Sequence, residues 1–408
     1  MKRTAFLFTA VLFVSTLLRA ADPLSREAIE QRIRQHRTAE VTFTVLAPDG
    51  SPLTGQPVTI RQTRHKFLFG CNAFEINTAD TSDLQRAYQR RFAALFNYAT
   101  LPFYWGAYEY QQGKPNEENL RRKADWCVQN GIRAKGHPLC WHEVQPKWLD
   151  GQPTNEVLRL QLDRIHRDIA AHKSAIHAWD VLNEAVVMPD AKNAIGNLCR
   201  SLGRGELIRQ TFATARRTDP KTLLILNDYI LNEKFQNLIH ECLDAGVTID
   251  AIGIQSHMHD GYWGAKKTWD VCEQYARFGK PIHFTETTIL SKLDAEQEQA
   301  RQVEEFYRVL FSHPSIEAIT WWDFSDFKAW KNAPAGLVRK DMTPKPAYDV
   351  LLRLIKNDWW TSEIKTATDV QGKVKVRGFL GDYRIECSYW QGSFTLDRNT
   401  KTATIQVR

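Results

Sequence analysis

The sequence predicts an α/β protein, a (β/α)8 TIM barrel with a small β-sandwich-like module formed by strands from both termini. Between Lys66 and Trp359, short apolar runs alternate with longer amphipathic stretches, as in successive parallel βα units. Eight such pairs within residues 67–358 fit the size of a barrel. Outside this region, apolar and polar residues alternate with the period of two that strands show.

The predicted barrel strands are short runs rich in branched and aromatic residues. They are Phe67–Cys71, Asn97–Phe103, Arg133–His137, Ala178–Asn183, Leu223–Asn227, Ala251–Ser256, Ile282–Thr285 and Ala318–Trp322. A doubly wound open sheet is the alternative architecture. Such a sheet usually has a Gly-rich phosphate loop after its first strand, and residues 67–74 contain no such loop, so the barrel is favoured.

Each predicted strand is followed by a stretch with helical periodicity. The first of these helices is capped by Ser82 or Asp83 and is predicted to bury Leu84, Tyr88, Phe92 and Leu95 on one face. The others are Glu117–Asn130, Thr154–His172, Arg204–Thr218, Glu233–Ala245, Thr268–Phe278, Ala295–Phe311 and Lys345–Lys356.

The two flanks are predicted to form one module. Residues 21–66 should contain a helix followed by a β-hairpin that turns at Pro48-Asp49-Gly50. Residues 359–408 are rich in strand-forming residues, and we expect them to pack with residues 39–66, since neither piece can bury a core alone. Tyr389 and Trp390 fit either the core of this module or an exposed carbohydrate-binding face.

Residues 1–20 have the pattern of a secretory signal peptide. Lys2 and Arg3 precede an apolar run over residues 5–18, which is short for a bilayer span, and the small Ala20 suits a cleavage site. We therefore expect a secreted or periplasmic protein with no membrane association once the signal is removed. The seven cysteines are widely spaced with no C-x-x-C, so most should be buried thiols. The formal charge of +7 is scattered, which argues against a nucleic-acid partner.

Polar residues are concentrated at the carboxyl ends of the predicted strands, where barrel enzymes carry their active sites. Glu184 and Glu286 end the fourth and seventh strands, among amides, imidazoles and indoles. Two carboxylates in such surroundings indicate sugar chemistry, because one can donate a proton while the other attacks. His257 and His259 alternate on one face, yet no third metal ligand follows at a suitable spacing, so no metal and no cofactor are expected.

At these positions the chain resembles glycoside hydrolase family 10, the retaining endo-β-1,4-xylanases, and it is a divergent member. The resemblance covers about residues 67–354. It is carried by the segments Gly136–His142, Trp179–Ala185, Asn227–Tyr229, Ile252–His257, Phe284–Glu286, Ile319–Trp322 and Pro344–Tyr348.

The resemblance implies a role for each matching residue. Glu184 would be the general acid/base and Glu286 the nucleophile. Asn183 would hold the sugar 2-hydroxyl, and Gln255 and His257 would lie against Glu286. The remaining substrate-binding residues that it implies are His137, Trp141, Tyr229, Trp322 and Trp330. The expected partner is xylan or another poly- or oligosaccharide, bound by a monomer.

Two departures from the family pattern bear on specificity. Residues 101–106 replace a Glu-Asn pair and a nearby Lys that grip the sugars on the non-reducing side, so those hydrogen bonds are lost. Tyr104, Trp105 and Glu109 are the predicted replacement surface, with core packing an equal alternative for at least one of the two aromatics. Thr288 stands where the family has an aspartate that orients the histidine on the sixth strand.

Three hypotheses for function follow. The leading one is a retaining endo-1,4-β-xylanase. The second keeps the mechanism but acts on another β-glycan or a decorated xylo-oligosaccharide, because the surface at residues 101–106 is altered. The third is a non-catalytic glycan-binding barrel, which the presence of both Glu184 and Glu286 disfavours.

Overall fold

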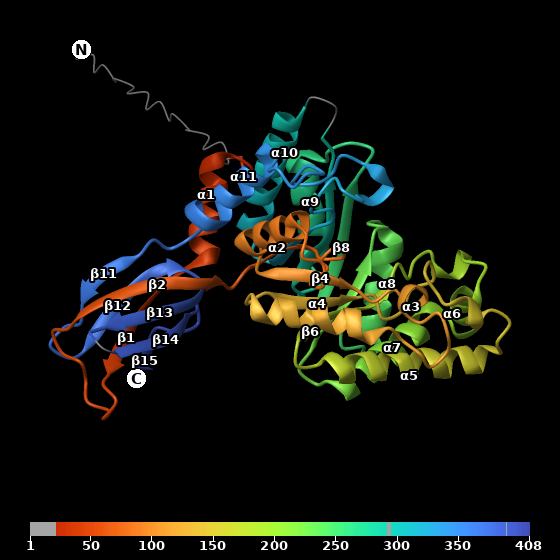
Figure 1. Cartoon of the computed structure of the whole chain (residues 1–408), viewed down its shortest axis with the longest axis horizontal. Helices are drawn as coiled ribbons and strands as arrows, with labels where there is room; N and C mark the ends of the chain where they lie inside the picture. The colour runs from red at the N-terminus through yellow and green to blue at the C-terminus, as the bar shows by residue number, and fades with distance from the viewer. Residues whose placement is uncertain (1–21, 292–294, 389) are drawn as a thin grey trace, which may run out of the picture.

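A computed structural model describes residues 22–291, 295–388 and 390–408. The predicted signal peptide, residues 1–20, lies outside the described residues. The chain forms a large barrel and a small β-module at one end, with α1 lying between them (Figure 1). In the described ranges we find no helix with the length and apolar character needed to cross a bilayer.

The predicted TIM barrel is confirmed: within the described residues, eight parallel strands close on themselves in the order β10-β3-β4-β5-β6-β7-β8-β9. The strands are β3 (Leu68–Asn72), β4 (Tyr98–Pro102), β5 (Arg133–His137), β6 (Ile176–Asn183), β7 (Leu223–Asp228), β8 (Ala251–Met258), β9 (Ile282–Ile289) and β10 (Ile316–Trp321). Each overlaps a predicted run. The parallel ladder brings all carboxyl ends to one rim, which is where the polar residues of the sequence are gathered.

Helices surround the barrel and bury their apolar faces against it. They are α2 (Asp83–Leu95), α3 (Trp105–Tyr108), α4 (Glu117–Gln129), α5 (Thr154–His172), α6 (Ala194–Leu202), α7 (Arg204–Thr218), α8 (Glu233–Asp244), α9 (Gly264–Ala276), α10 (Glu296–Ser312) and α11 (Pro346–Arg353). Ser82 caps α2 by accepting a hydrogen bond from the Gln85 N–H. Tyr88, Phe92 and Leu95 of α2 are buried, but the predicted burial of Leu84 is wrong: it lies in the first turn and is 38% exposed. The helix predicted over residues 345–356 is α-helical only to Arg353 and ends in a π-helical turn, Leu354–Asp358.

The β-module consists of two facing sheets. One has the order β12-β1-β15, from β12 (Lys373–Phe379), β1 (Thr38–Leu46) and β15 (Thr402–Gln406). The other has the order β11-β2-β13-β14, from β11 (Ile364–Ala367), β2 (Pro57–His65), β13 (Gly381–Cys387) and β14 (Trp390–Leu396). The predicted sandwich-like module is therefore confirmed. Trp390 is half-buried against its core, while Tyr389 lies outside the described residues.

The predicted hairpin is wrong, because β1 and β2 belong to different sheets. β1 pairs with β12 and β15, whereas β2 pairs with β11 and β13. Val41, Phe43 and Val45 of β1 nevertheless share one core with Val58 and Ile60 of β2. Alternation shows which face of a strand is buried but does not identify its neighbour, and here the two faces meet across the sandwich.

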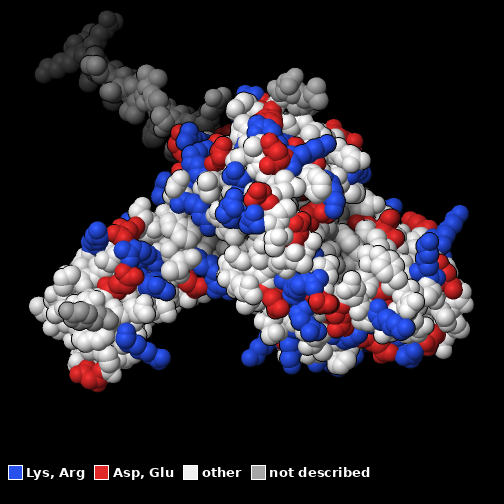
Figure 2. All heavy atoms as spheres, in the orientation of Figure 1, with Lys and Arg blue, Asp and Glu red and all other residues white. Residues whose placement is uncertain are grey.

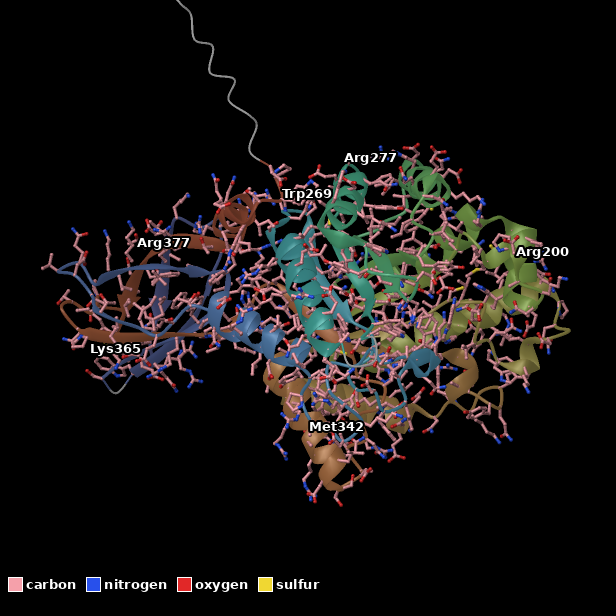
Figure 3. All side chains as sticks on the ribbon, turned by 90° about the horizontal axis from the view of Figure 1, so that it is seen from above. Arg200, Trp269, Arg277, Met342, Lys365 and Arg377 are labelled. Carbon is pink, nitrogen blue, oxygen red and sulfur yellow. The ribbon has the colours of Figure 1, made fainter. Side chains whose placement is uncertain are left out.

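The helix α1 (Arg26–Arg37) joins the module to the barrel. The Arg37 guanidinium is buried and donates hydrogen bonds to the carbonyls of Phe311, His313 and Ile316, at 2.5–2.8 Å. The Arg32 guanidinium lies over the Trp269 ring, 4.4 Å from its centroid, where Figure 3 shows Trp269 beside α1. These contacts hold the module against the amino-terminal end of the barrel, opposite the polar rim.

The surface carries charges of both signs. Figure 2 shows Lys and Arg interspersed with Asp and Glu over the visible face of both parts. In Figure 3, Lys365 and Arg377 of the module lie at one end of the molecule and Arg200 of α6 at the other. All seven cysteines are buried and none forms a disulfide.

Candidate active site

A cavity of about 890 Å³, including its mouth, opens at the carboxyl ends of the barrel strands. Glu184 directly follows β6, and Glu286 lies in β9, so the barrel brings two carboxylates more than a hundred residues apart into one cavity. Its lining consists of Asn72, Phe74, Glu75, Tyr88, Tyr104, His137, Trp141, Asn183, Glu184, Gln255, His257, Glu286, Trp322, Asp323, Phe324, Ser325, Phe327, Lys328 and Trp330.

Glu184 is held by both its backbone and its side chain. Its φ of 58° is unusual for a non-glycine residue, and its N–H donates to the Asn227 carbonyl at 2.8 Å. Oε2 accepts a hydrogen bond from Trp141 Nε1 at 2.9 Å, and Oε1 accepts one from Gln255 Nε2 at 3.1 Å. Burial, and then the negative charge of Glu286, raise the pKa of Glu184 to about 7. Near neutral pH this carboxyl group can therefore give up a proton or accept one.

Glu286 has the opposite electrostatic surroundings. Burial alone would raise its pKa, but the His137 and His257 imidazoles and the Lys135 ammonium lower it below its usual value. His257 Nε2 lies 3.0 Å from Oε2 and His137 Nε2 lies 3.8 Å from Oε1. Glu286 is thus the ionised member of the pair, as a carboxylate nucleophile must be.

Amide side chains connect the two carboxylates. Asn227 Nδ2 donates to Glu286 Oε1 at 2.9 Å and to Asn183 Oδ1 at 2.7 Å. Because the Asn183 amide oxygen accepts this bond, its Nδ2 points the other way and donates to Glu184 Oε1 at 3.1 Å. This chain fixes the two acids relative to one another before any substrate binds.

Gln255 lies next to Glu286 in the register of β8 and β9, which agrees with the position that the resemblance implies. Its amide nitrogen donates to Glu184 and to Asn183. The hydrogen bond from an amide to Glu286 comes from Asn227. The sequence marked Asn227 as a polar strand end, but strand periodicity alone could not show which carboxylate each amide reaches.

A buried ion-pair network beneath the cavity was missed. Asp180 Oδ2 lies 2.6 Å from Lys135 Nζ and 2.7 Å from His137 Nδ1, and all three side chains are almost fully buried. Lys135 and His137 are two residues apart in β5, so they share the inward face. A lysine and an aspartate inside otherwise apolar strands were the signal that could have identified them. The network orients the His137 ring whose Nε2 faces Glu286.

Thr288 takes over the contact expected from an aspartate. Its hydroxyl lies 2.9 Å from His257 Nδ1, while His257 Nε2 faces Glu286. The histidine is therefore still held at both nitrogens, but by a neutral partner on the side away from Glu286.

Aromatic rings form the walls of the cavity. Tyr104 lies 5.5 Å from Trp141 and 5.6 Å from His137, measured between ring centroids. Trp322 and Trp330 lie 5.6 and 4.7 Å from His257, and Trp330 is 42% exposed. Flat indole faces beside hydrogen-bonding groups suit the apolar and polar faces of a sugar ring.

Two of the predicted substrate-binding residues do not line the cavity. Trp105 is only 5% exposed, because it begins α3 and donates from its indole nitrogen to the equally buried Glu109 at 2.8 Å. Glu109 is also paired with Arg167, so both belong to the core and only Tyr104 forms the replacement surface. Tyr229 follows β7 at 45% exposure, outside the lining; burial and then the Glu184 charge raise the pKa of Tyr229.

No group of three His, Cys, Asp or Glu side chains in the described part of the chain is arranged to hold a metal ion. The barrel and its paired carboxylates of opposed acidity define a (β/α)8 protein with a site of the glycosidase type. The chain belongs to glycosyl hydrolase family 10, whose family model matches residues 61–354.

Relatives of two kinds match this chain. The anti-sigma-I factor RsgI6 of Acetivibrio thermocellus is 26% identical over 92% of this chain, which spans only about half (49%) of that protein. Endo-1,4-beta-xylanase B of Thermotoga neapolitana is 27% identical, and the match covers 62% of this chain and 78% of the relative.

Solved structures match the barrel. Native xylanase 10B from Thermotoga maritima superposes with a TM-score of 0.63 at 24% identity, covering 72% of this chain and 96% of that one, which establishes the fold. A psychrophilic family 10 endo-beta-1,4-xylanase superposes with a TM-score of 0.61 at 27% identity, covering 70% and 96%.

Proposed function

We propose that this protein is a retaining endo-1,4-β-xylanase that cleaves xylan by double displacement. The observation that carries the proposal is the pair Glu184 and Glu286 in one cavity, with the pKa of the first raised to about 7 and that of the second lowered. Family membership and the xylanase relatives support the substrate class.

The first step uses both carboxyl groups at once. Glu184 in its acid form donates its proton to the glycosidic oxygen, and that bond to the anomeric carbon breaks. Glu286 bonds to the same carbon, giving a covalent glycosyl-enzyme. In the second step, ionised Glu184 takes a proton from water, whose oxygen attacks the anomeric carbon and releases Glu286.

The supporting residues have distinct parts in this mechanism. Asn183, which donates to Glu184, would bind a sugar hydroxyl next to the reacting carbon, and the indoles of Trp141 and Trp322, which line the cavity, would flank the ring. His137 and His257 keep Glu286 ionised. The acid and nucleophile positions both carry a carboxyl group, and the pKa values of the two groups are shifted in opposite directions. This favours a catalytic protein over a barrel that only binds glycans.

A second candidate keeps this mechanism on a different substrate. Tyr104 is the one member of the predicted replacement surface that reaches the cavity, so glycone contacts differ from the family pattern. Another β-glycan or a decorated xylo-oligosaccharide would then be the better substrate. We propose that the protein acts outside the cytoplasm, on the basis of the signal pattern in residues 1–20.

A substrate panel tests the proposal. Purified protein is incubated with linear and branched xylans, β-glucans and aryl β-glycosides, and the products are separated and identified. Release of xylo-oligosaccharides from the xylan interior, abolished in Glu286→Ala, is the expected result. Turnover confined to glucans would favour the second candidate, and no turnover of any glycan would favour the binding barrel.

A further inference from the structure

Asp323 is a buried carboxylate in the cavity that the proposed mechanism does not use. It directly follows Trp322 and is 6% exposed. Its Oδ1 accepts a hydrogen bond from the Trp330 N–H at 2.9 Å, but its Oδ2 is buried with no partner among the described residues. Because burying an unpaired carboxylate oxygen is costly, such an oxygen in the lining of a cavity indicates that a ligand completes its hydrogen bonding.

The charges around Asp323 restrict what that ligand can be. Glu75 and Lys328, which also line the cavity, are paired with each other at 2.9 Å, so the lysine charge is already matched. With the Asp323 and Glu286 carboxylates in the same cavity, an anionic substituent such as a uronate would be repelled. An ionised carboxylate only accepts hydrogen bonds. The ligand that suits Asp323 Oδ2 is therefore a neutral group with hydroxyl donors.

The position of Asp323 in the barrel shows which part of the substrate it meets. Strand β10, which ends just before Trp322, lies across the closed barrel from β6, which carries Glu184. Glu184 must face the leaving group, so the opposite side of the cavity receives the sugars on the non-reducing side. Trp322 packs on His137 and His257, the rings that flank Glu286, and Asp323 is the next residue in the chain and lines the same cavity. The sugar unit beyond the one attacked is therefore the nearest candidate.

We propose that Asp323 is a specificity-determining residue: its Oδ2 accepts a hydrogen bond from a hydroxyl of the neutral sugar unit next to the attacked one on the non-reducing side. The contact replaces part of the glycone recognition that residues 101–106 no longer supply. Asn72 and Tyr88, which line the same cavity, provide further polar groups. This inference rests on the proposed function.

Paired substrates test the contact. The aryl glycosides 4-nitrophenyl β-xyloside and β-xylobioside differ only in the sugar that Asp323 should hold. Asp323→Ala should lower kcat/KM on the xylobioside by on the order of 10- to 100-fold, and on the xyloside by less than about threefold. Asp323→Asn keeps an acceptor for the Trp330 N–H but loses the carboxylate. Its kcat/KM should also fall more on the xylobioside than on the xyloside, by a smaller factor than in Asp323→Ala.

Binding provides a readout that is independent of turnover. Xylobiose is titrated by calorimetry into Glu286→Gln and into Glu286→Gln with Asp323→Asn, and at least tenfold weaker binding to the second is expected. If that weakening occurs but wild type hydrolyses neither glycoside, the proposed function fails while the Asp323 contact stands. Asp341→Asn, in an exposed turn, is the matched control and should change nothing.

Three outcomes would overturn the inference. Equal losses on both glycosides would mean that Asp323 acts only by holding Trp330. Unchanged kinetics and unchanged xylobiose binding in both variants would show that no substrate hydroxyl reaches Oδ2. Tighter binding of a uronate-bearing oligosaccharide than of xylobiose would contradict the neutral ligand.

Discussion

The two ends of the barrel both bury charged side chains, but in different ways. At the amino-terminal end, Arg37 satisfies its guanidinium with three backbone carbonyls and closes the contact between α1 and the barrel. At the carboxyl end, Glu286 is buried and Glu184 is half-buried, yet both line an open cavity and their pKa values are displaced in opposite directions. Buried charge with only internal partners stabilises the fold, whereas buried charge facing a cavity is available for chemistry.

The largest effect is expected at Glu286. Glu286→Ala removes the proposed nucleophile and should lower kcat on aryl xylobiosides by on the order of 10⁴-fold or more. Steady-state kinetics gives the loss, and thermal unfolding verifies that the variant is folded. Retention of more than a tenth of the wild-type rate would show that Glu286 is not the nucleophile. The carboxyl end of the barrel would then not differ from the amino-terminal end in the way described above.

Glu184→Ala should depend on the leaving group. Without the proton donor, substrates with poor leaving groups should lose on the order of 10²- to 10⁴-fold in kcat/KM, and dinitrophenyl glycosides much less. Rates for a series of aryl leaving groups measure this dependence. A uniform loss across the series would remove Glu184 from the role of proton donor.

Arg37 provides the matched test at the other end. Arg37→Met leaves three carbonyls without their donor and should lower the free energy of unfolding by roughly 2–5 kcal/mol. Urea denaturation measures this, and kcat/KM at a temperature where the variant is folded should stay within about twofold of wild type. Lost activity in a fully folded variant would show that the two ends are coupled.

The pH dependence should follow the acidity of Glu184. Because its pKa is raised to about 7, its acid form is lost as the pH rises through that value, and kcat/KM should fall on the alkaline side. In Glu286→Gln the like charge is gone, so the pKa of Glu184 should move down. NMR titration of labelled glutamate carboxyls measures both, and an unchanged value would show that the acids are not coupled.

The smallest expected effect is at Trp141. Its indole N–H stabilises the ionised form of Glu184, so Trp141→Phe should raise the pKa of Glu184 further. The alkaline limb of the kcat/KM profile should move up by at most about 0.7 pH unit, given a hydrogen bond worth about 1 kcal/mol. A move to lower pH would contradict the proposed direction of this bond.

Sequence periodicity predicted the barrel well because its signals are local. The bounds of α5 and α7 match the predicted Thr154–His172 and Arg204–Thr218, where an amphipathic stripe runs the whole length. Pairing between strands is not local, which explains the error at β1 and β2. A stretch such as 57–65 alternates equally well whether its neighbour is the preceding strand or one at the far end of the chain.

The site was predictable in position but less so in detail. Strand ends placed Glu184 and Glu286 at one rim, since parallel strands must end together. The hydrogen-bond partners of side chains depend on rotamers and on neighbouring strands, so the sequence alone did not show that Gln255 donates to Glu184 or that Lys135 pairs with Asp180. Trp105 was misplaced because an aromatic residue after a strand serves equally well as core or as sugar platform.

The most direct test of the central claim is to trap the glycosyl-enzyme. The protein is treated with a 2-deoxy-2-fluoro-β-xylobioside that has a good leaving group, and the labelled peptide is identified by mass spectrometry. We expect one sugar adduct per chain, bonded to Glu286 and formed slowly. The Glu286→Gln variant should form none. An adduct on another residue, or an α-anomer as the first product from a β-linked substrate, would contradict it.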